Sequence, residues 1–432
     1  MEIKTIAIVG IFLMIFSNQI LAGANNKIIV LGGGIIGVTS AYYLAESGYD
    51  VTVVEQQDDV AQASSFANGA QLCYSCIYPL CHQSIYAALW TRLSTLQLSS
   101  WAFLNSRFIQ RIENYLFEKA LNRELTAYRN KLFKQSALEF NALVKKLNLS
   151  FPYQTTGVLQ LFFTEMDFIR AKKSAIYKVQ HGVQLEILSP QECLHQEPSL
   201  RFNQQDLRGG ILMQHDGIGD AHLFTKALAQ ACCELGVKFL LNTEVEKFTF
   251  AGNHINGLIT KHKQSLNADA FVVCLGVNSQ PLLAQLAIDL DINVIKGYSI
   301  SIDLEDSDEL PTIGIADPSH EIFYARLANS FRVAGLTELA GMDTTLKPEK
   351  IEILLDAVNN LFPNLQVKAK ERAGMVHKWA CLRPSSVTKT PLIMRSKFNN
   401  LFINTGHGGY GWTLAPASGK LLAELVKNTI VG

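Results

Sequence analysis

Residues 27–55 read KIIVLGGGIIGVTSAYYLAESGYDVTVVE. The apolar run at 27–31 predicts a buried parallel strand. Apolar residues then recur at helical spacing until Gly48, which predicts a helix that ends at a glycine. Residues 51–54 predict a second strand, followed directly by Glu55. The stretch therefore predicts a βαβ unit with glycines in its first turn.

The glycines of this turn form the pattern G-x-G-x-x-G at Gly32, Gly34 and Gly37. Glycines there let the backbone turn tightly and approach a pyrophosphate, and the free N–H groups of the helix N-terminus favour phosphate. Glu55 comes near the spacing of roughly 20 residues at which a carboxylate binds the adenosine ribose. Because this carboxylate would repel a 2′-phosphate, the motif predicts FAD or NAD rather than NADP.

The residues after the βαβ unit favour FAD over NAD. A nicotinamide enzyme usually continues with further alternating strands and helices. Here residues 84–148 read as helical and contain neither proline nor glycine, and the strand signals of such a sheet return near residue 237. A single nucleotide-binding half with a large insertion is typical of a flavoprotein, in which FAD lies extended through the protein.

Composition indicates a folded chain with a large core. The 432 residues include 38 Lys plus Arg and 38 Asp plus Glu, so the formal net charge is zero. This argues against nucleic acid as a partner and against an acidic disordered chain. Hydrophobic residues make up 48% and charged residues 18%, below the roughly 25% of an average soluble domain, which favours contact of part of the surface with a membrane or partner.

The first 24 residues differ from the rest. Lys4 precedes an apolar run of about a dozen residues and a small-residue patch at 22–24, a pattern that predicts a secretory signal or a retained membrane anchor. The alternative is a mis-assigned start. We expect an inner-membrane-associated or periplasmic protein if the segment is genuine, and a cytoplasmic one otherwise.

The eight cysteines do not form a disulfide framework for a chain of this length. Cys73, Cys76 and Cys81, followed by His82, are a candidate metal cluster, but no second CxxC or HxxxH pair accompanies them. The sequence therefore predicts apolar packing of this loop and no metal site.

Motifs along residues 27–427 resemble those of the D-amino-acid oxidase family of FAD enzymes, and within it those of the bacterial D-amino-acid dehydrogenases. The segments that carry the resemblance are GVLQLF at 157–162, GD at 219–220, KGYS at 296–299, LRP at 382–384, NTGHG at 404–408 and GWT at 411–413. The resemblance implies an α/β fold with a discontinuous Rossmann-like FAD domain and a mixed-sheet substrate domain with inserted helices. We assign residues 25–86, 205–290 and 375–432 to the FAD domain, and 87–204 and 291–374 to the substrate domain.

The resemblance also implies which residues hold FAD. For the ADP half they are Gly32, Gly34, Gly37, Glu55, Val245 and Gly276. For the ribityl chain and ring they are Ser64, Ser65, Asn68, Gly69 and Gln71. A late turn would close over the ring with Gly406, Gly408, Gly409, Gly411, Trp412 and Thr413. Independently, glycines in this turn clear side chains so that backbone amides can face the N1–C2=O end of a reduced flavin.

Four residues are candidates for the catalytic site. Arg383 is expected to bind a substrate carboxylate, because a guanidinium matches a carboxylate bidentately; the alternative is a surface arginine. Tyr298 and Tyr324 are candidates for the pocket and equally for the core. His407 is a candidate base, with a role in shaping the backbone beside the flavin as the alternative. No base is needed if the amine arrives neutral, since a hydride then passes from Cα to flavin N5.

The resemblance implies oxidative deamination of an amino acid, with the D configuration favoured, and with electrons passed to a quinone or another acceptor. The alternatives are an oxidase for glycine, sarcosine or another secondary amine, a non-catalytic FAD-binding subunit, and, least favoured, a nicotinamide dehydrogenase.

Two departures from the family pattern bear on this expectation. The stretch 385–394 lacks the usual Asp-Gly pair and the last glycine. Cys381 replaces a usual glycine, and because relatives such as sarcosine oxidase tether flavin through a cysteine near this place, a covalent Cys381–flavin bond is a further hypothesis.

Aromatic residues from Trp90 to Phe108, interleaved with Arg92 and Arg107, fit either a membrane surface or a helix pair in the core.

Overall fold

The computed structural model describes residues 26–76, 106–200, 206–305, 308–365 and 374–430, and the side chains of its longest helix from residue 125 onward. The expected signal or anchor at 1–24 and Cys81 with His82 therefore lie outside the described residues. The same holds for the side chains of the aromatic segment from Trp90 to Phe108. Among the helices in these ranges, none has the length and apolar character needed to cross a membrane.

A six-stranded sheet carries the predicted βαβ unit. Strand β1 (Lys27–Leu31) pairs in parallel with β2 (Asp50–Val54), and α2 (Ile35–Glu46) connects them, so the predicted unit is confirmed. The strand order is β19 (Leu392–Arg395), β20 (Leu401–Thr405), β13 (Ala270–Val273), β1, β2 and β9 (Lys238–Leu240). Within this sheet, only β19 runs antiparallel to its neighbour. Strands from both halves of the sequence thus meet in one sheet.

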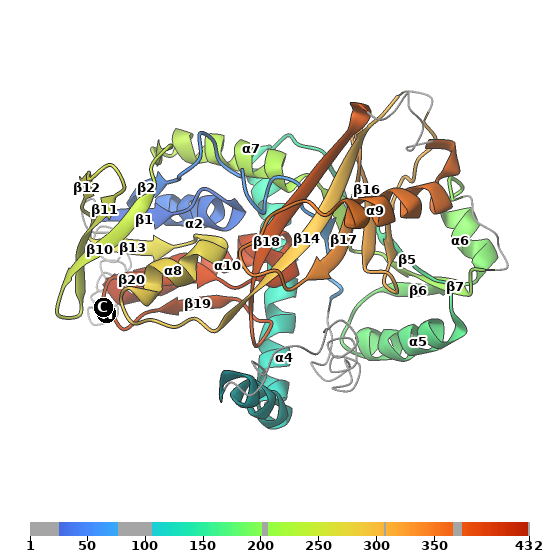
Figure 1. Ribbon diagram of the computed structural model, residues 1–432, viewed down its shortest axis with the longest axis horizontal. Coiled ribbons are helices and arrows are strands. Elements are labelled where there is room, and N and C mark those ends of the chain that lie inside the picture. The colour runs from blue at the N-terminus through green and yellow to red at the C-terminus, as the bar shows by residue number, and fades with distance from the viewer. Residues whose placement is uncertain (1–25, 77–105, 201–205, 306–307, 366–373, 431–432) are drawn as a thin grey trace, which may run out of the picture.

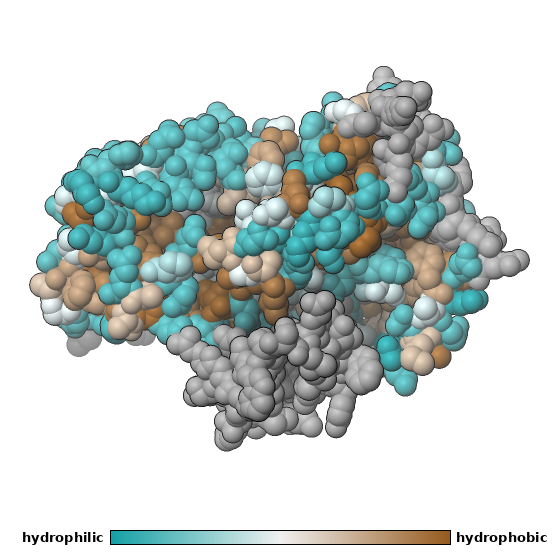
Figure 2. All heavy atoms as spheres, in the orientation of Figure 1, coloured by the Kyte–Doolittle hydropathy of each residue, from teal (hydrophilic) through white to brown (hydrophobic). Residues whose placement is uncertain are grey.

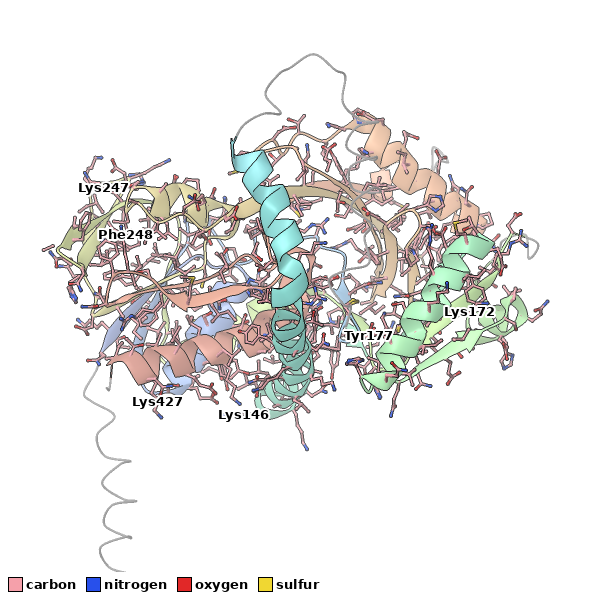
Figure 3. All side chains as sticks on the ribbon, turned by 90° about the horizontal axis from the view of Figure 1, so that it is seen from below. Lys146, Lys172, Tyr177, Lys247, Phe248 and Lys427 are labelled. Carbon is pink, nitrogen blue, oxygen red and sulfur yellow. A yellow bond between two sulfur atoms is a disulfide. The ribbon has the colours of Figure 1, made fainter. Side chains whose placement is uncertain are left out.

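Both faces of this sheet are covered, as its continuous apolar strands require. Ile28 and Val30 face a core shared with α2, α7 (Ala221–Glu234) and α10 (Gly411–Ile430). Ile29 and Leu31 face the other way, towards α8 (Ser279–Ala284) and a small sheet. That sheet consists of β10 (Val245–Ala251), β11 (His254–Thr260) and β12 (Ser265–Leu266), and its Phe248 is labelled in Figure 3.

An eight-stranded mixed sheet forms the other half of the molecule (Figure 1). Its order is β18 (Val376–Ser386), β14 (Ile292–Asp303), β17 (Ser330–Glu338), β16 (Ile322–Leu327), β15 (Gly314–Asp317), β5 (Val158–Phe162), β7 (Gly209–Met213) and β6 (Leu185–Leu188). Helix α9 (Pro348–Leu361) and α6 (Pro190–Gln196) cover one face through a shared apolar core, and α5 (Glu165–Gln180) packs on the opposite face of its β5–β7 end.

Helix α4 (Ser106–Leu147) crosses the molecule between the two halves and packs against α10 and α2 (Figure 3). Beside it lies a small sheet of β3 (Gln71–Leu72), β8 (Gly217–Gly219) and β4 (Tyr153–Gln154). Despite the low share of charged residues, hydrophilic side chains cover most of the described surface that is in view in Figure 2.

Candidate functional site

The turn after β1 requires glycine at two positions. Gly32 has φ +104°, and a Cβ on it would lie 2.6 Å from the carbonyl oxygen of Cys274. A Cβ on Gly37 would lie 1.8 Å from the carbonyl oxygen of Gly32, so α2 packs directly on the turn. Gly34 is the N-cap of α2 and provides no side-chain hydrogen bond to it. Apart from the Ile35 N–H, which Ser65 binds, the helix N-terminus therefore has no side-chain cap and suits an anion, as the motif predicts.

Glu55 lies against this turn. Its Oε2 accepts a hydrogen bond of 2.6 Å from the Gly33 N–H, and its Oε1 accepts one of 2.9 Å from the Gln57 N–H. The Glu55 carbonyl oxygen accepts from the Thr243 N–H, which brings the start of β10 and Val245 towards the same region. Backbone donors thus fix the carboxylate beside the phosphate-binding turn.

Gly276 comes after β13 on the neighbouring strand. Its φ is +59°, and no atom lies within 4 Å of the position of a Cβ on it. The residue therefore borders open space at the carboxyl end of the parallel strands, where such sheets bind ligands.

The loop Ser64–Gln71 forms hydrogen bonds with α2 of one half of the molecule and with β18 of the other. Ser65 Oγ accepts a hydrogen bond of 3.1 Å from the Ile35 N–H at the start of α2. Ser64 Oγ donates one of 2.6 Å to the Leu382 carbonyl oxygen on β18. Asn68 Oδ1 accepts from the Ala70 N–H within the loop, and Gln71 Nε2 is buried with no hydrogen-bond partner. The loop thus leaves an amide donor for a ligand between the two sheets.

One face of the eight-stranded sheet is turned towards this loop. Cys381 and Trp379 of β18 pair with Gly297 and Ser299 of β14, so their side chains share that face. Ser299 Oγ donates a hydrogen bond of 2.7 Å to the Ala67 carbonyl oxygen. Gly69 is also in contact range, since a Cβ on it would lie 3.9 Å from the Ala334 Cβ of β17. We call this surface the loop face.

Arg383 lies on the loop face, and its guanidinium extends over Gly297. A Cβ on Gly297 would lie only 1.7 Å from Arg383 Nη2, and a Cβ on Gly409 of the late turn would lie 3.6 Å from Nη1. No described residue forms a hydrogen bond or an ion pair with this guanidinium. Glycines from two distant segments thus leave room for a half-buried cation whose donors remain free for a ligand.

The late turn lies beside β18 through a backbone bridge between Ser385 and His407. Gly406 and Gly408 have φ of +79° and +59°, and α10 begins at Gly411. Thr413 Oγ1 accepts a hydrogen bond of 3.0 Å from the Cys73 N–H. Trp412 Nε1 is buried with no partner, which leaves a second unsatisfied donor near the start of α10.

His407 is fully enclosed by this turn. Its Nε2 lies 3.1 Å from Ser418 Oγ, and burial lowers the pKa of the imidazole to about 3. An imidazole with that pKa is a poor proton acceptor at pH 7. The geometry therefore favours the role of shaping the turn over the role of base.

Tyr298 and Tyr324 do not share a pocket with Arg383. Both are 1% exposed and lie in the apolar core under α9, on the face opposite the loop face. Tyr298 donates a hydrogen bond of 2.7 Å to Glu338 Oε1, and the Tyr324 ring packs 5.8 Å from the Phe362 ring. Side chains alternate along a strand, so Tyr298 points away from the face that its neighbour Gly297 joins. Of the two expected roles, the geometry favours the core role for both tyrosines.

The cysteine loop also differs from expectation. Cys76 packs in an apolar cluster, as predicted, but it is disulfide-bonded to Cys73, with the two Cα atoms 5.6 Å apart. Within the described residues, no group of three or more His, Cys, Asp or Glu side chains could hold a metal ion. Cys381 is a free thiol on the loop face; burial raises its pKa, while the nearby guanidiniums of Arg383 and Arg332 lower it.

Arg332 of β17 is a site residue that sequence reasoning missed. It is 7% exposed, and its Nη1 donates a hydrogen bond of 3.2 Å to the Asn68 carbonyl oxygen. The available signal was a single arginine within the otherwise apolar strand segment FRVAG.

Comparison with known families agrees with this geometry. A family model described as "DAO: FAD dependent oxidoreductase" matches residues 27–425. The chain belongs to this family. It is 34% identical over 406 residues to a D-amino acid dehydrogenase from Neisseria gonorrhoeae, covering 93% of this chain and 95% of that protein. It is 32% identical over 408 residues to a D-amino acid dehydrogenase from Vibrio vulnificus, again covering 93% and 95%.

Solved structures of low sequence identity share the fold. Glycine oxidase from Bacillus cereus superposes with a TM-score of 0.69 at 21% identity, covering 94% of this chain and 95% of that one. L-Proline dehydrogenase from P. horikoshii superposes with a TM-score of 0.72 at 19% identity, covering 94% of both chains. The expected fold class is thereby confirmed.

The residues fit the FAD of this family. The glycine turn, the fixed Glu55 carboxylate and the open space at Gly276 suit the ADP half. Gln71 Nε2 and Trp412 Nε1 are buried donors that only a ligand or water would satisfy. The protein is an FAD-dependent oxidoreductase of this family.

Proposed function

We propose that this protein oxidises the Cα–N bond of an amino acid, with D-amino acids preferred, to an imine that water hydrolyses to a keto acid and ammonia. The D preference is supported by relatives that are named D-amino acid dehydrogenases. The observation that carries the proposal is the free guanidinium of Arg383, held over Gly297 on the face that meets the loop Ser64–Gln71.

In this proposal Arg383 binds the substrate carboxylate with two parallel hydrogen bonds and thereby orients the Cα–H bond. When bound, FAD accepts the hydride. No protein base is required if the amine arrives neutral, and the low pKa of His407 agrees with this assignment. The Phe66 and Trp379 rings, 4.8 Å apart, border the loop face and would limit access of water.

We further propose a quinone or another carrier, rather than oxygen, as the electron acceptor, because the relatives are named dehydrogenases. Contact with a membrane surface is also part of the proposal, and it would bring the site close to a lipid-soluble acceptor.

The non-catalytic alternative rests on the altered stretch after Arg383. In the structure this stretch closes its own turn, because Ser386 Oγ donates to the Thr390 carbonyl oxygen and accepts from the Thr390 N–H. Although it lacks the Asp-Gly pair, the stretch therefore still forms a hydrogen-bonded turn after β18.

Anaerobic titration of the purified holoprotein tests the function. We expect D-amino acids to bleach the flavin absorbance near 450 nm, and their L-enantiomers to bleach it much less. Bleaching by glycine or sarcosine alone would support the secondary-amine alternative. Full retention of colour with every amine tested, in a protein that dithionite still bleaches, would support the non-catalytic alternative.

A further inference from the structure

Arg332 is a buried cation whose hydrogen-bond partners are all neutral. It is the third residue of β17 and lies between Phe331 and Val333, which are both 0% exposed. Its Nε donates a hydrogen bond of 2.6 Å to Ser301 Oγ, and its Nη1 donates one of 3.2 Å to the Asn68 carbonyl oxygen. None of the described carboxylates forms an ion pair with it.

Burial of a charge without an ion-pair partner costs free energy, and buried charges in proteins are usually paired. Burial lowers the pKa of the Arg332 guanidinium. An arginine side chain nevertheless keeps its proton in proteins, so loss of the proton does not remove this charge. The nearest acidic influence is Asp220, but its carboxylate accepts the Leu223 N–H as the N-cap of α7. Among the described residues Arg332 therefore has no ion-pair partner, although the Asp220 carboxylate still acts on its charge from beyond ion-pair distance.

The neighbours of Arg332 show where its charge acts. Ser301 pairs with Arg332 across β14 and β17 and lies on the loop face with Gly297 and Ser299. The Cys381 thiol, also on this face, is influenced by the charges of both Arg332 and Arg383. The positive charges of Arg332 and Arg383 thus both act on the loop face near Cys381. Of the two, only Arg332 forms a hydrogen bond with the Ser64–Gln71 loop.

We propose that Arg332 is a positioning residue for FAD, which holds the loop through the Asn68 carbonyl and stabilises the negative charge of the reduced flavin. The proposal rests on the proposed function. Transfer of a hydride, two electrons and one proton, from the substrate to a neutral ring leaves the ring with one negative charge. A preorganised buried cation stabilises that charge without reorganisation, and departure of the electrons to the acceptor removes it.

The test measures the flavin midpoint potential of the holoprotein by dithionite titration with redox dyes, which needs no amino-acid turnover. Arg332→Gln removes the charge but keeps an amide donor for Asn68. Arg332→Lys keeps the charge but loses the planar fork. The matched control is Arg326→Gln, which removes an equal charge at an exposed position on the adjacent strand β16.

We expect Arg332→Gln to weaken binding of reduced relative to oxidised FAD at least tenfold, which lowers a two-electron potential by about 30 mV. Arg332→Lys should keep most of the potential, and Arg326→Gln should leave it unchanged. A wild-type potential in Arg332→Gln would overturn the inference, as would an equal drop in Arg332→Lys. If Arg332→Gln does not retain FAD, the test rests on Arg332→Lys, which keeps the charge. A tenfold weaker binding of reduced relative to oxidised FAD in Arg332→Lys would then overturn the inference.

The two proposals can fail separately. A protein that holds FAD with the expected variant potentials, yet is not reduced by any amino acid, would refute the proposed function and leave the electrostatic role of Arg332 intact. Reduction of the flavin by D-amino acids, together with unchanged midpoint potentials in the variants, would support the proposed function and refute the electrostatic role of Arg332.

Discussion

Replacement of Gly297 by alanine should weaken carboxylate binding without removing the residue that binds it. The new Cβ would lie 1.7 Å from Arg383 Nη2, 2.7 Å from Cζ and 3.0 Å from Nε. Ordinary van der Waals contact begins at 3.4 Å, so the guanidinium must retreat by about 1.7 Å. Gly297 does not have a positive φ, so alanine is compatible with the local backbone of β14.

A displacement of this size breaks the bidentate geometry of the two charge-assisted hydrogen bonds. Each such bond contributes about 1.5–3 kcal/mol, so loss of both corresponds to about 3 kcal/mol or more. Carboxylate affinity should then fall at least about 100-fold. The assay is the dissociation constant of a non-reducing carboxylic acid such as benzoate, measured from the perturbation of the flavin spectrum, together with kcat/KM for a D-amino acid.

Two comparisons separate the mechanism from general damage. Gly374→Ala adds the same methyl group where no atom lies within 4 Å, and it should bind benzoate as the native protein does. Arg383→Lys should show a comparable loss to Gly297→Ala, because it removes the fork directly. Native affinity in Gly297→Ala, with FAD still bound, would refute the assignment of Arg383 as the carboxylate anchor.

Three further outcomes depend on particular residues. Gly37→Ala places a Cβ 1.8 Å from the Gly32 carbonyl oxygen and should abolish FAD retention. Flavin absorbance and the melting temperature will show this loss, and a native FAD content would contradict the packing argument. Burial raises the pKa of Asp216 to about 6, so its protonated form favours the folded state and the free energy of unfolding falls as pH rises from about 4 to 6. Denaturant titrations should show this fall in the native protein and lose it in Asp216→Asn; equal slopes in both would refute it. Burial also raises the pKa of Cys381 and disfavours a nucleophilic thiolate, so acid denaturation should release all yellow colour, and colour retained by the chain would establish the tether.

The parts of the fold that were predictable are local in sequence. The unit at 27–55 was predicted because strand, glycine turn and helix each leave a short local signal in the sequence, and the need for glycine at position 37 comes from the carbonyl of Gly32, five residues earlier. The loop Ser64–Gln71 was expected only through the family resemblance, whereas the late turn was also expected from its glycines. The structure supplies a physical reason for the expectation, in the buried free donors of Gln71 and Trp412.

The parts that were not predictable depend on strand pairing. Gly297 and Tyr298 are adjacent in sequence but lie on opposite faces of one sheet, and only the register with β18 decides which face meets Arg383. The position of the Arg332 side chain depends on hydrogen bonds to Ser301 and Asn68, which lie 31 and 264 residues away in sequence. No periodicity within a single strand carries that information.

The route of the chain out of β18 constrains how the protein can move. β18 forms the edge of the eight-stranded sheet, and after a short turn the same chain becomes β19, the edge of the six-stranded sheet (Figure 1). Ser64 and the Ser385–His407 bridge add cross-links on either side of Arg383. A clamshell opening of the two halves would therefore strain the arginine's own strand. We therefore expect the two sheets to stay together during turnover, and movement of the loops around the site, rather than separation of the sheets, to limit product release.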